Sequence, residues 1–148
     1  MRKIRLLLPC LFMILLSASF SSAQTLPFDE YGDVDCEDEM ARLDNFAVKL
    51  RDTPNDVGYA IVYGGQDGRR GEALARAARI KDYLIKSRGL ESNRVMTIDG
   101  GYREKLTVDL WIVPSGESGP KAEPTIQLKD IRFKRGKIKR SAYRRCQI

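Results

Sequence analysis

The sequence contains no histidine, so it lacks the side chain most often used as a general base near neutral pH and the commonest ligand of transition metals. Catalysis would have to use carboxylates or lysines, and no pair of carboxylates has a spacing that suggests such chemistry. We therefore expect no catalytic site, no metal site and no cofactor. Apolar runs are also short: residues 6–16 form a run of about 11 residues, where about 20 are needed to span a bilayer.

That short apolar run lies in the N-terminal segment. Arg2, Lys3 and Arg5 precede it, and small residues up to Ala23 follow it, which is the three-part pattern of a secretory signal peptide. The pattern predicts that residues 1–23 are removed, that the mature chain starts at Gln24, and that the protein is exported to the periplasm or the outer envelope. The alternative is an uncleaved membrane anchor, which the length of the run disfavours. After cleavage we expect no transmembrane segment.

Charge is distributed unevenly along the mature chain. Residues 24–120 contain 13 Lys and Arg against 18 Asp and Glu, whereas residues 121–148 contain 10 basic residues and 2 acidic ones. Such asymmetry indicates an acidic domain with a basic tail that contacts an anionic surface or partner. Export makes nucleic acid an improbable partner, and a disordered tail is the alternative.

Cysteine is scarce, with three residues in the whole chain, and Cys10 lies in the predicted signal peptide. The remaining pair is Cys36, in an acidic stretch, and Cys146, in the basic tail. In an exported protein an even pair is a candidate disulfide, and the opposite charges would bring the two segments together. Two free thiols are the alternative.

Periodicity predicts a domain over residues 24–113 with the order β-α-β-α-β-β. The expected elements are a strand in 28–34, a helix capped by Asp35 and ending near Asp52, a strand at 57–63, a helix from about 71 to 86 or 87 with Gly89 as its C-terminal cap, and strands at 94–98 and 106–113. We expect the last two strands to form a hairpin around a polar turn at 100–105. The fold class is α+β, a two-layer sandwich with two helices on one face of a mixed sheet. Residues 114–124 are rich in Pro, Gly and Ser and are predicted to be a linker to the tail at 125–148.

Short motifs follow one another in a fixed order along this domain. They are Leu43-Asp44, Pro54, Gly64-Gly65-Gln66-Asp67, Arg76-Ala77, Asp82-Tyr83-Leu84, Gly89, Arg94 and Gly100-Gly101. In this order they resemble the OmpA-like peptidoglycan-binding family, over residues 28–113. The resemblance implies an OmpA C-terminal-like fold and non-covalent binding of peptidoglycan.

The same resemblance implies a ligand site at the end of the second predicted strand, around Gly64 and Gly65. In the family, the aspartate and the arginine that correspond to Asp67 and Arg76 hold the ammonium and the carboxylate of diaminopimelate in the stem peptide. A fixed anion and a planar cation suit such a zwitterion. The segment between Asp67 and Arg76 is shorter than in the family, so the helix must begin near Glu72 for Arg76 to lie about one turn inside it.

Ordinary structural roles are the alternative for these residues. Asp67-Gly68 is a common turn pair, and Arg76 follows Glu72 by four residues, a favourable spacing for a solvent-exposed ion pair. In that case the domain is a scaffold that has lost its ligand site. It would act through the basic tail, on a protein partner or an anionic surface.

Overall fold

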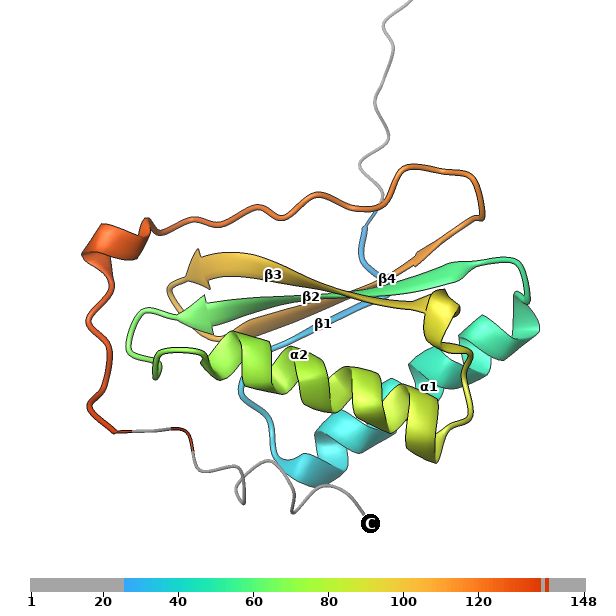
Figure 1. The fold of residues 1–148 in the computed structure, drawn as a ribbon, viewed down its shortest axis with the longest axis horizontal. Coiled ribbons are helices and arrows are strands. Elements are labelled where there is room, and N and C mark those ends of the chain that lie inside the picture. Colours follow the sequence, from blue (N-terminus) through green and yellow to red (C-terminus); the bar gives the residue numbers. More distant parts are fainter. Residues whose placement is uncertain (1–25, 137, 139–148) are drawn as a thin grey trace, which may run out of the picture.

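The computed structural model describes residues 26–136 and residue 138. It has two helices packed on one face of a mixed four-stranded sheet, so the predicted α+β class is confirmed (Figure 1). The strands are β1 (Asp29–Tyr31), β2 (Val57–Gly65), β3 (Val95–Arg103) and β4 (Thr107–Val113), and the helices are α1 (Cys36–Asp52) and α2 (Glu72–Asp82). A π-helical turn, Tyr83–Ser87, continues α2, and Gly89 follows with a positive φ of 67°. The signal-peptide prediction lies outside the described residues.

Local signals explain where α1 begins and ends. The side chain of Asp35 accepts a hydrogen bond from the backbone N–H of Asp38, and three acidic residues occupy the first turn, where they complement the helix dipole. The helix ends at Asp52, as the following Thr-Pro-Asn-Asp turn predicts. Its apolar face, with Leu43, Phe46 and Leu50, is buried against the sheet.

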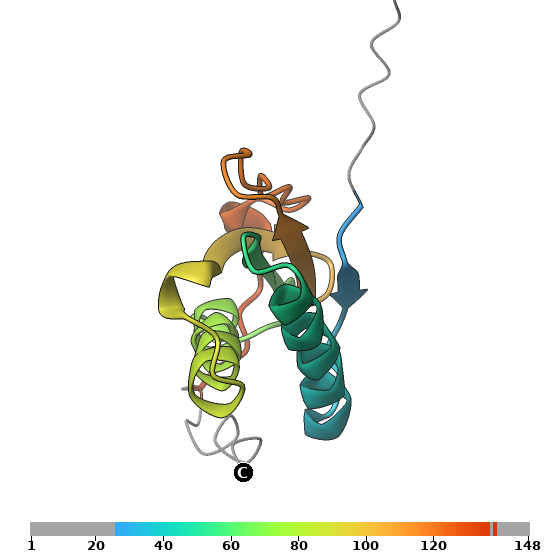
Figure 2. The same cartoon turned by 90° about the vertical axis from the view of Figure 1, so that its right-hand side faces the viewer.

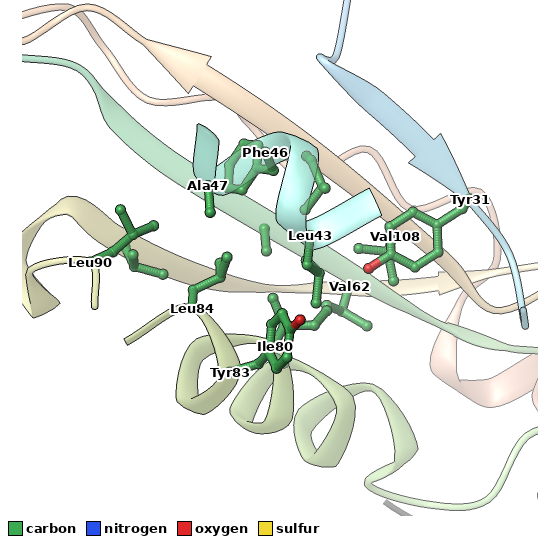
Figure 3. Packing of buried hydrophobic residues seen from close by; sticks show 14 of the residues in the cluster. Tyr31, Leu43, Phe46, Ala47, Val62, Ile80, Tyr83, Leu84, Leu90 and Val108 are labelled. Atoms are coloured by element: carbon green, nitrogen blue, oxygen red, sulfur yellow. The ribbon is translucent and has the colours of Figure 1, made fainter. Parts of the chain in front are cut away.

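The core lies between the two helices and the sheet. Figure 3 shows Leu43, Phe46 and Ala47 of α1 facing Val62 of β2 and Val108 of β4, with Ile80 and Leu84 closing the side formed by α2. Figure 2 shows α1 and α2 side by side beneath the sheet. Among the described residues, no helix is long and apolar enough to cross a membrane.

The strand order β1-β4-β2-β3 overturns the predicted hairpin of the last two strands. β2 lies between them, parallel to β3 and antiparallel to β4. β2 is the most apolar strand and has both faces buried, which suits a central position. The chain from β3 to β4 therefore crosses the end of β2, and the backbone N–H of Gln66 donates to the carbonyl of Glu104 at 3.2 Å.

The predicted turn at 100–105 is also wrong, because β3 continues to Arg103. Val62 pairs with Asp99 and Gly64 pairs with Tyr102, so β3 contains one extra residue, a β-bulge. Gly101 lies in this bulge with a φ of 79°, a conformation that favours glycine. The glycine pair therefore marks a bulge within a strand. The first strand is likewise shorter than predicted, with three residues paired to β4.

Residues 114–124 cross the face of the sheet opposite the helices (Figure 1). The backbone N–H of Glu123 donates to the hydroxyl of Tyr63 at 3.1 Å, and Gly119 lies against the ring of Tyr59. This covering explains why Ile61 and Tyr63, on the opposite side of β2 from the core, are also buried.

Candidate binding site

The loop after β2 lies at the end of the sheet where the sequence predicts a ligand site. Residues 66–71 form turns and irregular loop, and α2 begins at Glu72, so Arg76 lies about one turn inside the helix. The backbone N–H of Gly68 donates to the Gly65 carbonyl, and that of Arg69 donates to the Glu72 carboxylate at 2.9 Å. Asp67 is exposed in this loop. The start of α2 therefore meets the condition stated above for Asp67 and Arg76 to share one ligand, namely a helix that begins near Glu72.

The guanidinium of Arg76 does not approach Asp67. It belongs to an ionic cluster between α1 and α2, which consists of Asp33, Glu39, Arg76 and Arg79. One guanidinium nitrogen of Arg76 lies 2.5 Å from the carboxylate of Asp33, and the other lies 3.3 Å from that of Glu39. Arg79 pairs with Glu39 as well. Arg76 is only 5% exposed, and its Nε has no hydrogen-bond partner among the described residues. The structure therefore directs this arginine toward α1 and the loop before it.

Arg76 is absent from the lining of the hollow beside Asp67, which has a volume of about 470 Å³. We call this space the charged hollow, because its lining contains both signs of charge. The acidic residues are Asp33, Asp67, Glu72 and Glu104, and the basic ones are Arg69, Lys105 and Lys134. They come from the segments that follow β1, β2 and β3, and from the C-terminal tail.

Gly64 and Gly65 have a packing role at this end of β2. A Cβ on Gly64 would lie 2.8 Å from the ring of Tyr102, and one on Gly65 would lie 2.9 Å from the backbone nitrogen of Leu106. Both glycines thus allow neighbouring chain to approach closely, and for Gly65 that chain is the connection from β3 to β4. Gly65 also lines the charged hollow.

The basic tail begins on this same end of the sheet. The backbone N–H groups of Thr125 and Ile126 donate to the Tyr102 carbonyl at 3.0 Å, and that of Lys134 donates to the Gly68 carbonyl at 3.0 Å. Phe133 packs edge-on against Tyr102, with ring centroids 5.7 Å apart. A second hollow, of about 490 Å³, lies between residues 66–67 and residues 129–132. Residues 125–136, the tail segment from here on, therefore pack against the loop that contains Asp67.

An ion pair on the opposite face of the sheet was missed by the sequence reasoning. Asp109 of β4 is 4% exposed and lies 3.0 Å from the guanidinium of Arg103 on β3. Burial raises the pKa of Asp109, and the neighbouring Arg103 opposes that rise. Asp109 and Trp111 are two residues apart on β4 and therefore share the face of the strand that points away from the core. A tryptophan on that face is the signal that could have indicated that this side of the sheet is covered.

Only one of the two predicted disulfide partners lies in the described part of the chain. Cys36 is the first residue of α1, and Cys146 lies outside the described residues. The bridge stays a prediction. Within the described part of the chain, no group of three or more Cys, Asp or Glu side chains could hold a metal ion.

Comparison with known proteins identifies no relative. No protein-family model matches the chain, and neither a curated protein nor a solved structure is significantly similar to it.

Proposed function

We propose that this protein is an exported, envelope-associated binding module that binds peptidoglycan non-covalently through the diaminopimelate of its stem peptide. The observation that supports the proposal is the charged hollow beside the exposed Asp67. Diaminopimelate presents ammonium and carboxylate groups together, and a hollow lined by both signs of charge can pair with both. Asp67 would receive the ammonium.

The residue that would bind the carboxylate of the ligand follows less directly from the resemblance, which implies Arg76. For Arg76 to bind a ligand, Asp33 would have to give up its ion pair, since Arg76 is already neutralised by Asp33 and Glu39. Asp33 is the more accessible of the two carboxylates, because its side chain is 76% exposed while that of Glu39 is 3% exposed. The proposal therefore depends on Asp67 and on the hollow, and it does not require a free Arg76.

The test is cosedimentation of the mature protein with purified peptidoglycan sacculi at low and high salt. The decisive variant is Asp67→Asn, which removes one exposed charge without disturbing a buried group. We expect it to weaken binding about tenfold or more, the loss of one charge-assisted hydrogen bond. Asp52→Asn is the matched control, because Asp52 is exposed at the end of α1, before β2 begins. Equal binding by both variants and the wild type would refute the proposed site.

A second candidate function is a scaffold that contacts an anionic envelope surface or a protein through its tail. The internal pairing of Arg76 favours it, because a guanidinium held by two carboxylates is not available to a ligand. Replacing the five basic residues after position 136 by glutamine separates the two functions. Wall binding that survives this change and resists salt supports the hollow, whereas binding that is lost supports the tail. These five residues are Lys137, Lys139, Arg140, Arg144 and Arg145.

A further inference from the structure

The tail segment is attached to the domain by specific contacts. Its backbone bonds to Tyr102 at one end and to Gly68 at the other, and Ile126 forms an antiparallel bridge with Tyr102. Between these points Phe133 packs on Tyr102 on one side, while the guanidinium of Arg70 lies 4.6 Å from its ring centroid. Figure 1 shows this part of the chain descending past the loop that joins β2 to α2. Such anchoring fixes the residue next to Phe133, which is Lys134.

Lys134 lies at the charged hollow because of this anchoring. Its backbone N–H donates to the Gly68 carbonyl, and the residue belongs to the lining of the hollow together with Asp67. A free tail would bring its cations to the hollow only transiently. Here the anchored backbone keeps Lys134 in the lining that also contains Asp67, the residue proposed to bind the ligand.

The hollow offers charged residues of both signs to a ligand. Arg76 neutralises Asp33, and the rest of the lining contains the acidic Asp67 and Glu104 together with the basic Arg69, Lys105 and Lys134. Glu72 already accepts the backbone N–H of Arg69 at 2.9 Å. A lining that contains both signs of charge favours a ligand that brings one charge of each sign over a simple anion or a simple cation.

We infer that Lys134 of the tail provides the cation for the ligand's carboxylate, so that the site for an amino-acid zwitterion is completed by the C-terminal segment. Asp67 binds the ammonium, Lys134 binds the carboxylate, and Phe133 is a positioning residue that holds Lys134 in place. Arg76 then serves the packing of α1 against α2. This inference rests on the proposed function. It replaces Arg76 by Lys134 as the cation that binds the carboxylate of the ligand.

The test uses two soluble ligands that differ only in carboxylates, measured by calorimetric titration of the full mature chain. Diaminopimelate has two carboxylates, and cadaverine is the same carbon chain with the two ammonium groups alone. We expect Lys134→Gln to weaken diaminopimelate about tenfold or more without weakening cadaverine, which has no carboxylate to lose a partner. Asp67→Asn should weaken both ligands, because both present an ammonium. The matched control is Arg135→Gln, which removes one charge from the next residue, exposed and outside the hollow.

A second variant tests the positioning. Phe133→Ala keeps every charge but removes the contacts with Tyr102 and Arg70, so it should weaken diaminopimelate binding while circular dichroism still shows a folded domain. Equal losses in Lys134→Gln and Arg135→Gln would overturn the inference, since the effect would be general attraction by the tail. If Asp67→Asn weakens binding and Lys134→Gln does not, the inference fails and the proposed function stands. If neither variant changes binding, both fail.

Discussion

The guanidinium of Arg76 lies between two carboxylates, and its burial decides how the residue can be studied. Glu39, at the centre of the same ionic cluster, is 2% exposed and also faces the hydroxyl of Tyr31 at 3.4 Å. Burial, reinforced by Glu39, raises the pKa of that tyrosine. Removing one partner of a buried ion pair leaves an uncompensated charge and costs about 3–5 kcal/mol. Loss of binding on truncation of Arg76 would therefore report on folding, which is why Asp67 and Lys134 are the informative positions.

A second polar contact at the residue scale predicts a pH dependence of stability. Asp44 of α1 accepts hydrogen bonds from Arg88 and from the hydroxyl of Tyr83, the first at 2.7 Å and the second also at 2.7 Å. The hydrogen bonds from Arg88 hold the pKa of Asp44 below its ordinary value, against the opposing effect of burial. A lowered pKa stabilises the folded state above the ordinary aspartate pKa of about 4, and this contribution is lost as the pH falls through the lower, folded-state value.

Asp44→Asn should therefore be less stable than the wild type at pH 7, and the difference should shrink as the pH falls below the folded-state pKa. Thermal unfolding followed by circular dichroism from acidic to neutral pH measures this difference. Asp52→Asn serves as the control, because Asp52 is exposed at the end of the helix. A difference between Asp44→Asn and wild type that stays constant across this range would contradict the assignment.

Arg94 connects three elements at the other end of the sheet. It lies in the short 3-10 turn before β3, and its guanidinium donates to the carbonyls of Leu50, Thr53 and Asp56, at 2.6, 2.8 and 3.0 Å. The first of these carbonyls belongs to the last turn of α1, where backbone acceptors lack helical partners and a cation is favourable. One side chain thus joins the end of α1, the turn that follows it and the start of β3.

Replacing Arg94 by lysine should lower the free energy of unfolding by about 1–3 kcal/mol. Nη2 of the guanidinium donates to all three carbonyls while Nε donates to that of Asp56, and a lysine has no second donor nitrogen. Urea denaturation measures the change. Arg135→Lys is the matched control, since Arg135 is exposed. The assignment is wrong if both substitutions change the stability equally.

The whole molecule combines an acidic domain with a basic tail whose first residues pack on that domain. Residues 114–124 cover the second face of the sheet, and the tail segment then reaches the charged hollow. The C-terminal part therefore belongs to the folded unit as far as residue 136. Attraction between opposite charges along the chain favours this arrangement, and it also favours a covalent link between Cys36 and Cys146.

If the two cysteines are bridged, the protein should have a mass about 2 Da lower before reduction than after it, since forming one S–S bond removes two hydrogens. Intact-mass spectrometry of the oxidised and reduced protein measures this. Cys36→Ser should abolish the difference within a monomer. Two thiols that alkylate without prior reduction would exclude the bridge.

Much of the fold follows from local sequence patterns. The cap at Asp35, the turn after Asp52 and the alternation of Val108 and Leu110 with Trp111 depend on neighbours a few residues away, so the bounds of α1 and the faces of β4 could be predicted. The helix predicted from about residue 71 begins at Glu72, directly after the glycines of the preceding loop. The peptidoglycan ligand, the roles of Asp67 and Arg76, export and the disulfide stay predictions that the structure does not test.

The tertiary structure alone decided the features that join distant segments. β2 lies between β3 and β4, and its two faces are covered, one by the helices and one by residues 114–124; no local pattern contains that information. Arg76 lies 43 residues from Asp33 in sequence, and Lys134 reaches a loop more than 60 residues earlier. The sequence by itself determined the bounds of α1 and the two faces of β4, because capping and periodicity depend on residues a few positions away. Packing decided which charged residues lie together at the candidate site, because it brings residues that are far apart in the sequence close together in space.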